Sequence, residues 1–478
     1  MKKRLVLLIL LLFLALLSLC LIGASVQQEK DRITITEQAR FGDPSLARHA
    51  TLSLSAQMNE HQLWNMTYPI GGVPTTEYRF SAKELEFEHK VTYNGIQLYE
   101  DIPFGYDLRT SPEETTGIQR AYRELYDATA PGTKGTKIVR LQDYYEYYPI
   151  RMEIDLPGTL WHTVNYDDLD ERDDINQRKV WDAFREFFKI PIPENLPAFE
   201  ISITKDESGK EIGIGSSSPA KYEDGYALYS EATYTSNACF FTLNNRMGDG
   251  YVDTSLIPGG YGIYRFSYTK VRNEQNTKGN VTIFHPGYLT GVDADSLVMV
   301  YPLEQHIQVR AMFVNPEETR LLLLTDEKNG VYLTVIDIAT MTELQKFRIT
   351  DNAHVSLNQQ DDFIILFYEQ KFSVFSVDEH GLYTPAITAD QPVMTDDTFA
   401  HINTYSAMDF DGTYLVMADV LPSEHYYALQ TCHFCLAVYD RTGLRYYGEY
   451  QNSLSVNPDT NYYHCNVIPF EIAVHLNS

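Results

Sequence analysis

Hydrophobic and polar positions alternate most regularly in the last third of the chain. Three segments there repeat one order: an apolar run, a second strand that ends in Asp, a polar turn and a short third strand. The second strands end at Asp337, Asp378 and Asp440, so the Asp recurs after 41 residues and then after 62. The extra 21 residues fit an insertion around Ser423–Tyr427, between the first two strands of the third segment. The pattern predicts strands at 320–324, 331–337, 344–349, 363–367, 372–378, 382–383, 414–417, 434–440 and 444–447.

The rest of the chain is also rich in strand-like runs, and two helical patterns interrupt them. Glu114–Ala128 and Glu171–Lys189 each place aromatic and aliphatic side chains on one helical face, and the second helix stops before Pro191 and Pro193. The remaining predicted strands are 32–36, 51–55, 78–80, 138–141, 238–243, 262–268, 281–284 and 296–301.

A period near 41 with several strands per repeat is typical of β-propeller blades. Val335–Thr340, followed by Leu344 and Phe347, resembles the blade motif of YVTN-type and WD-like propellers. It departs from that motif at Met341, where those families prefer Gly. Asp409-Phe-Asp-Gly412 also resembles the Asp-x-Asp-Gly turn between blade strands. The resemblance covers about 160 residues and implies a fold rather than an activity.

The fold class that follows is all-β with a few helical insertions, a propeller of about seven or eight blades preceded by one transmembrane helix. We expect the exported domain to span 25–478, with clear blades in 201–478. Residues 25–200 are divergent and are either further blades or a separate β subdomain. If the ring closes, a strand near Arg32–Thr36 should pair beside the last strand, Val467–Val474.

Segments near the N-terminal end carry a second resemblance. Gly42-Asp43, Leu63–Thr67 and Phe187–Pro191 are similar to segments of uncharacterised membrane-anchored proteins of Gram-positive bacteria. This resemblance implies a location in the cell envelope and no mechanism.

The first 24 residues predict the compartment. Residues 1–4, Met-Lys-Lys-Arg, form a basic tip, and residues 5–24 contain no charge. As a helix, 5–24 would be about 30 Å long, enough to cross a bilayer. Cleaved signal peptides have a shorter apolar region, so an uncleaved signal anchor is favoured over cleavage after Ala24. The positive-inside rule then keeps the N-terminus cytoplasmic and exports 25–478. The first partner predicted is therefore the lipid bilayer, contacted through 5–24.

Composition adds limits on function. The chain is 44% hydrophobic and 13% aromatic, which fits packed β-structure and excludes a disordered protein. Its formal charge of -27 argues against nucleic-acid binding, which needs a basic face.

Four cysteines lie outside the apolar segment, and three of them raise a metal hypothesis. Cys432 and Cys435 form a CxxC, and His464 and Cys465 follow about thirty residues later, so these four residues are the candidate metal ligands. Residues i and i+3 of a strand point to opposite faces, with Cα atoms about 10 Å apart, which excludes a disulfide between Cys432 and Cys435. Buried structural cysteines are the favoured interpretation. A disulfide from Cys465 to Cys432 or Cys435 is the alternative. No cofactor is predicted beyond that candidate structural metal ion.

Other chemistry is sparse. No GxSxG, HExxH or Walker A motif occurs. The acidic run Asp167–Asp174 precedes the second helix, where carboxylates stabilise a helix start, although such a cluster can also bind Ca²⁺. Tyr144–Tyr148 fits β-packing or stacking on sugar rings. The histidines 285, 306, 354 and 401 are scattered, and Asn65 and Asn280 match the glycosylation sequon.

Two functions stay open at this point. The first is a membrane-anchored, extracytoplasmic propeller that binds an envelope protein or glycan, which the absent catalytic motifs favour. The second is an envelope hydrolase or lyase with a carboxylate-lined central channel, which distant blades can assemble without a local motif.

Overall fold

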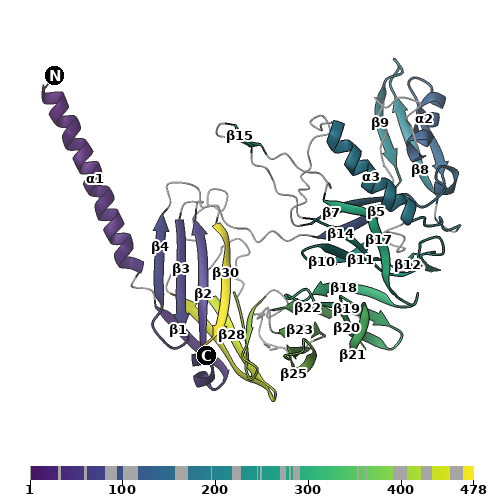
Figure 1. Cartoon of the computed structure of the whole chain (residues 1–478). Coiled ribbons are helices and arrows are strands. Elements are labelled where there is room, and N and C mark those ends of the chain that lie inside the picture. The colour runs from purple at the N-terminus through teal and green to yellow at the C-terminus, as the bar shows by residue number, and fades with distance from the viewer. Residues whose placement is uncertain are drawn as a thin grey trace. The chain divides into compact units, whose positions relative to one another are not determined.

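A computed structural model describes most of the chain. The described residues are 2–30, 34–58, 62–80, 94–100, 117–156, 171–194, 196, 198–217, 228–244, 246–247, 250–269, 276–278, 281–283, 291–351, 355–360, 363–369, 371–390, 406–420, 433–452 and 467–477. They form two compact units, one made of residues 1–90 and 354–478 and the other of residues 91–353. Strands predominate in both units, as expected from the sequence (Figure 1).

The first unit contains three antiparallel sheets of four or five strands, ordered β22-β23-β24-β25, β1-β29-β28-β27-β26 and β30-β2-β3-β4. Its elements are α1 (Lys2–Lys30), β1 (Ile35–Gly42), the 3-10 helix η1 (Pro44–His49), β2 (Ala50–Met58), β3 (Gln62–Pro69), β4 (Thr75–Phe80), β22 (Val355–Gln359), β23 (Phe363–Tyr368), β24 (Lys371–Val377), β25 (Tyr383–Asp390), β26 (Ala407–Phe410), β27 (Leu415–Val420), β28 (His433–Asp440), β29 (Gly443–Asn452) and β30 (Val467–Leu476).

Strands from distant parts of the sequence complete two of these sheets. β30 pairs with β2, with Val474 opposite Leu52, and β1 pairs with β29, with Glu37 opposite Tyr450. The predicted pairing of a strand near Arg32–Thr36 with the last strand is therefore wrong in detail, because β2 occupies the place beside β30. β1 is mostly exposed, and such a strand fits an edge, whereas Leu52 is fully buried.

The recurring Asp residues have a structural role. Asp337 Oδ1 accepts hydrogen bonds from the backbone N–H and the hydroxyl of Thr340, both at 2.9 Å. Asp378 and Asp440 accept backbone N–H bonds in the same way, from the turns that follow β24 and β28. The hydrogen bond from Thr340 is the main cause that lowers the pKa of Asp337. The repeat is therefore a repeat of turns that fix the next strand.

The second unit holds sheets β10-β11-β14-β17 and β18-β19-β20-β21, with smaller sheets beside them. Its elements are β5 (Gly95–Glu100), α2 (Gly117–Ala128), β6 (Lys134–Val139), η2 (Leu141–Asp143), β7 (Ile150–Asp155), α3 (Glu171–Phe187), β8 (Phe199–Lys205), β9 (Glu211–Ser216), β10 (Ser230–Tyr234), β11 (Ala238–Leu243), β12 (Arg246–Met247), β13 (Gly250–Tyr251), β14 (Gly262–Tyr268), β15 (Asn276–Lys278), β16 (Val281–Ile283), β17 (Val292–Pro302), β18 (Gln308–Val314), β19 (Arg320–Glu327), β20 (Gly330–Asp337) and β21 (Thr342–Thr350).

Both predicted helices form in this unit. The buried face of α2 includes Ile118, Tyr122 and Leu125, so aromatic and aliphatic side chains do lie on one face of this helix. From α3 and the residue that follows it, Phe184 and Phe188 pack on Phe241, Tyr264 and Phe266, with ring centroids 4.9–6.1 Å apart. Rings at these distances add to the burial of apolar surface, so α3 covers the sheet β10–β17 firmly.

The described residues provide five sheets of four or five strands, not the seven or eight blades expected. The expectation divided chain length by blade length, but α2, α3 and the sheet β6-β8-β9 use much of 117–216. Each of the sheets β18–β21 and β22–β25 is a simple antiparallel meander, which is the strand order of a propeller blade. No sheet of the described residues closes on itself.

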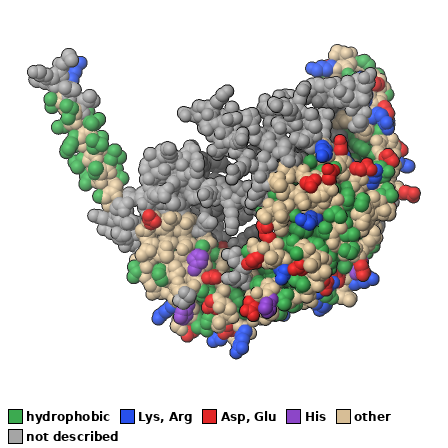
Figure 2. All heavy atoms as spheres, in the orientation of Figure 1, with side chains coloured by type: hydrophobic (Ala, Val, Ile, Leu, Met, Phe, Trp, Pro, Cys, Tyr) green, Lys and Arg blue, Asp and Glu red, His purple; other side chains and the backbone are tan. Residues whose placement is uncertain are grey.

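α1 covers the apolar segment as a single helix. Val6, Phe13 and Leu19 are each more than 60% exposed, and Figure 2 shows hydrophobic side chains along the helix. Within the described residues, no helix meets the length and hydropathy needed to cross a membrane.

Candidate ligand-binding cleft

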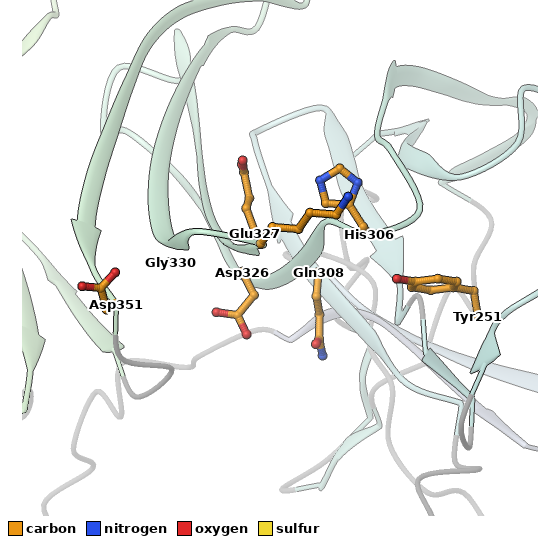
Figure 3. Close-up of a pocket in the computed structure, with 8 residues that line it drawn as sticks. Tyr251, His306, Gln308, Asp326, Glu327, Gly330 and Asp351 are labelled. Atoms are coloured by element: carbon orange, nitrogen blue, oxygen red, sulfur yellow. The ribbon is translucent and has the colours of Figure 1, made fainter.

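A cleft of about 270 Å³ opens at one end of the sheet β18–β21 (Figure 3). In an antiparallel meander, the start of the first strand lies beside the end of the second and the start of the third. Gln308 begins β18, Asp326 and Glu327 end β19, and Gly330 begins β20. Asp351, directly after β21, completes this wall of the cleft. The strand order alone therefore gathers these residues.

Successive residues of β19 point to different sides of the cleft. Asp326 and Glu327 are adjacent, so their side chains point to opposite faces of the sheet. Gln308 is the cross-strand partner of Asp326, and Figure 3 shows both side chains pointing the same way. An amide and a carboxylate thus lie next to each other on one face.

Each carboxylate of the cleft is held by a basic side chain. Glu327 Oε1 lies 2.6 Å from Lys346 Nζ. Asp326 accepts a hydrogen bond from Arg310, which raises the pKa of that guanidinium. Asp351 forms an ion pair with Arg348. The carboxylates are therefore fixed in position and their charges are balanced, so they can serve as oriented hydrogen-bond acceptors.

Four further groups offer contacts to a ligand. The ring of Tyr251, from the β12–β13 hairpin, is 48% exposed and its hydroxyl points toward the Gln308 side of the cleft (Figure 3). The Gln308 amide donates to the hydroxyl of Tyr229 at 2.7 Å. His306 Nδ1 lies 3.1 Å from Glu304 Oε2. Lys328 lines the cleft without an ion pair to any described residue. One flat ring and several polar groups therefore face a single small volume.

This lining fits a polar organic ligand better than a metal ion. Among the described residues, no group of three or more His, Cys, Asp and Glu side chains could hold a metal. A ligand with hydroxyl groups would find acceptors in the carboxylates and donors in Lys328 and the histidine.

The sequence-based metal candidates are not brought together by the described structure. Cys435 lies on β28, fully buried and with a free thiol. Cys432, His464 and Cys465 lie outside the described residues. Burial raises the pKa of the Cys435 thiol to about 12, which suits a structural cysteine rather than a reactive one.

Some of the other residues singled out in the sequence lie in described elements, and others lie outside the described residues. Tyr148 is buried, which agrees with the packing interpretation for that residue, and the Tyr144 hydroxyl donates to Glu124 at 2.9 Å. His306 lines the cleft. Asn65 lies on β3. Outside the described residues lie Asp167, Asp168, Asp170, His285, Asn280, His354, His401 and the insertion at 423–427.

Comparisons with known proteins give only remote likenesses. No protein family and no curated protein sequence matches the chain. A putative 6-phosphogluconolactonase from Bacteroides fragilis is similar at 10% identity and a TM-score of 0.27, over 84% of this chain and 94% of that one. An oligogalacturonate lyase in complex with manganese is similar at 8% identity and a TM-score of 0.26, over 88% and 96%.

A third solved structure is a β-propeller by its own description. It is the β-propeller domain of Cps50 (Swd1) from Myceliophteria thermophila, similar at 11% identity and a TM-score of 0.24, over 51% of this chain and 66% of that one. Scores this low transfer neither an activity nor a site. The blade-like character of the sheets therefore rests on their strand order.

Sequence reasoning missed most of the cleft. Tyr251, Gln308 and Asp351 stand on separate elements, and no spacing rule connects them. The usable signal was the polar turn Asp326–Gly330 between two buried strands, because functional residues collect on such loops.

Proposed function

We propose that this protein is a membrane-anchored, extracytoplasmic propeller-like module that binds a glycan of the cell envelope in the cleft at Tyr251. The observation that carries the proposal is the exposed Tyr251 ring beside fixed polar groups. Sugars present C–H faces that stack on an aromatic ring and hydroxyls that need both donors and acceptors.

The charge balance supports a binding role. The carboxylates of Asp326 and Glu327 are paired with Arg310 and Lys346, so the cleft is not strongly acidic despite the net charge of the chain. A neutral or weakly charged glycan would therefore not be repelled. The same carboxylates, with His306, also support the alternative of an envelope hydrolase or lyase.

The anchoring part of the proposal rests on α1. Many of its apolar side chains are exposed, among them Val6 and Phe13, and neither of these two residues belongs to a hydrophobic core cluster of the described residues. Burying them in lipid would remove that apolar surface from water. The basic tip Met1–Arg4 would then stay on the cytoplasmic side.

Titration of the full-length protein in detergent with a panel of neutral and acidic oligosaccharides tests the binding function. We expect binding that Tyr251→Ala weakens about tenfold, because stacking is worth on the order of 1 kcal/mol or more. Tyr251→Phe keeps the ring and is the matched control. Equal binding by all three proteins, or no binding to any oligosaccharide, would reject the glycan site. New reducing or unsaturated ends after incubation would support the enzyme instead.

Membrane location has its own test. Alkaline carbonate extraction of membranes from expressing cells should leave the full chain in the pellet. Added protease should digest residues after α1 only from the outer side of intact cells. Recovery of the chain in the carbonate supernatant would contradict anchoring without affecting the glycan test.

A further inference from the structure

A second cleft, of about 390 Å³, lies at the other end of the sheet β18–β21. It is lined by the β10–β11 turn, by Glu317 and Glu318 after β18, and by Ile338 and Ala339 after β20. Gln308 begins β18, whereas Glu317 follows its end, so the two clefts open at opposite ends of one sheet. Nothing in the glycan proposal uses this site.

Arg265 of this cleft differs from the comparable described arginines. Among the described residues, four arginines have a buried Nε without a hydrogen-bond partner: Arg123, Arg265, Arg310 and Arg320. The other three form ion pairs, with Asp127, Asp326 and Asp337. Arg265 forms no ion pair with any described residue. Its guanidinium carbon lies 5.9 Å from the centroid of the Phe240 ring, which is a cation–π contact. A guanidinium that lines a cleft and forms no ion pair with a described residue is suited to bind an anion.

The residues around Arg265 determine which kind of anion fits the cleft. Phe240 is its cross-strand partner, and with Ala238, Ile338 and Ala339 it gives the cleft an apolar wall. The exposed Asn237 adds a side-chain amide at the rim. An occupant therefore needs both an anionic group and an apolar body.

The acidic residues of the cleft limit the charge of that occupant. Glu318 is held by Ser236, whose N–H and hydroxyl donate to its two oxygens at 2.7 Å each. Glu317 Oε2 accepts from the Asn315 amide at 2.7 Å. The two carboxylates lie beside the site as hydrogen-bond acceptors, so they repel a doubly charged phosphate more than a single carboxylate.

We propose that the Arg265 cleft binds a carboxylate carried on an apolar body, such as an acylated amino acid or the carboxyl terminus of a peptide. The guanidinium pairs with the carboxylate, and the apolar body lies against Phe240 and Ile338. This site is independent of the glycan cleft, since the two share no lining residue.

Titration of the full-length protein in detergent with N-acetyl-leucine, followed by NMR or calorimetry, tests the proposal. We expect saturable binding below about 10 mM, the range of a single charged contact with a small apolar partner. N-acetyl-leucinamide, which lacks the carboxylate, should bind at least about tenfold more weakly. Inorganic phosphate is the third arm and should not compete. Absence of binding, equal binding of the amide, or preferential binding of phosphate would each overturn the proposal.

Variants locate the site. Arg265→Met keeps the stem and should weaken N-acetyl-leucine binding at least about tenfold. Glu317→Gln removes one repelling charge and should strengthen binding by about twofold or more. Arg140→Met, an exposed arginine in the same unit, is the control and should change nothing. If Arg265→Met does not fold, the stronger N-acetyl-leucine binding expected of Glu317→Gln still tests the proposed site. Unchanged binding in both variants would overturn the assignment.

Discussion

Asp409 and Leu476 are joined across 67 positions of the chain: the Asp409 carboxylate accepts the backbone N–H of Leu476, with Oδ2 2.6 Å from the amide nitrogen. Asp409 lies on β26 and Leu476 is the last residue of β30, so this bond links two sheets of the first unit. An aspartate that resembled part of a blade turn in the sequence thus fixes the strand that completes another sheet.

Asp409→Ala should lower the free energy of unfolding by about 1–3 kcal/mol, because the Leu476 N–H loses its acceptor. Asp409→Asn keeps an oxygen at the same place and should cost less. Urea unfolding of the three proteins measures the difference. Equal stability of the alanine variant and the parent would show that the bond contributes nothing.

Alanine substitutions at two glycines distinguish the cost of a steric overlap from the cost of a strained backbone angle. Gly42 has φ +77°, and an added Cβ would lie 1.8 Å from the carbonyl oxygen of Arg445. Gly42→Ala should therefore destabilise the protein by more than about 3 kcal/mol, since β1 must move away from β29. Gly443 has φ +111° with nothing near its Cβ position, so Gly443→Ala should cost only about 1–2 kcal/mol. Thermal unfolding followed by circular dichroism ranks the two, and the reverse order would contradict this view of the β1–β29 pairing.

Stability should depend on pH through Glu231. Burial raises the pKa of this carboxyl on β10 from 4.5 to about 7. The folded state then binds more protons than the unfolded state between these values, so stability falls as pH rises from about 4.5 to 7. Glu231→Gln should remove that slope and add about 1–2 kcal/mol above pH 7, after allowance for partial exposure. Denaturant unfolding across this range tests it, with the exposed Glu200→Gln as the control. A parent slope unchanged in Glu231→Gln would assign the titration to another group.

The two described buried cysteines should be unreactive in the folded protein. Cys239 and Cys435 are fully buried with free thiols, and burial raises the pKa of both. At about pH 8 almost no thiolate is present to attack iodoacetamide. Peptide mapping by mass spectrometry should find both labelled in guanidinium chloride and neither labelled without it. Labelling of Cys435 in the native protein would show that β28 opens readily.

The strands that the sequence predicted are those whose burial is simplest. Leu321, Leu322, Leu323 and Leu324 are all buried in β19, so an uninterrupted apolar run was a sufficient signal. The helix α3 was predictable because Phe184 and Phe188 share one face. The strands β22 and β26 were not predicted, because they are short and only half-buried and lack such a run.

The candidate sites were much less predictable than the strands. Arg265 and Glu317 are 52 positions apart, and Tyr251 and Asp351 are 100 apart, so only the pairing of strands brings each set together. No local sequence pattern can predict that an arginine forms no ion pair, because the pairing of its guanidinium depends on all the residues that surround it in the folded protein. His306 was noticed as a residue, yet its place in the cleft follows from the β17–β18 connection.

The pairing of β2 with β30 has a consequence for biosynthesis. The ribosome delivers residues 91–353 as one continuous stretch, so the second unit has all its strands before the chain is finished. The first unit cannot complete its sheet β30-β2-β3-β4 at that stage, because β2 lacks its neighbour on one side until β30, Val467–Leu476, has been translated. During that interval β2–β4 expose an unpaired edge, the kind of surface that leads nascent chains to associate wrongly. The sheet β30-β2-β3-β4 can therefore be completed only after β30 has been translated, whatever the speed at which its individual hairpins form.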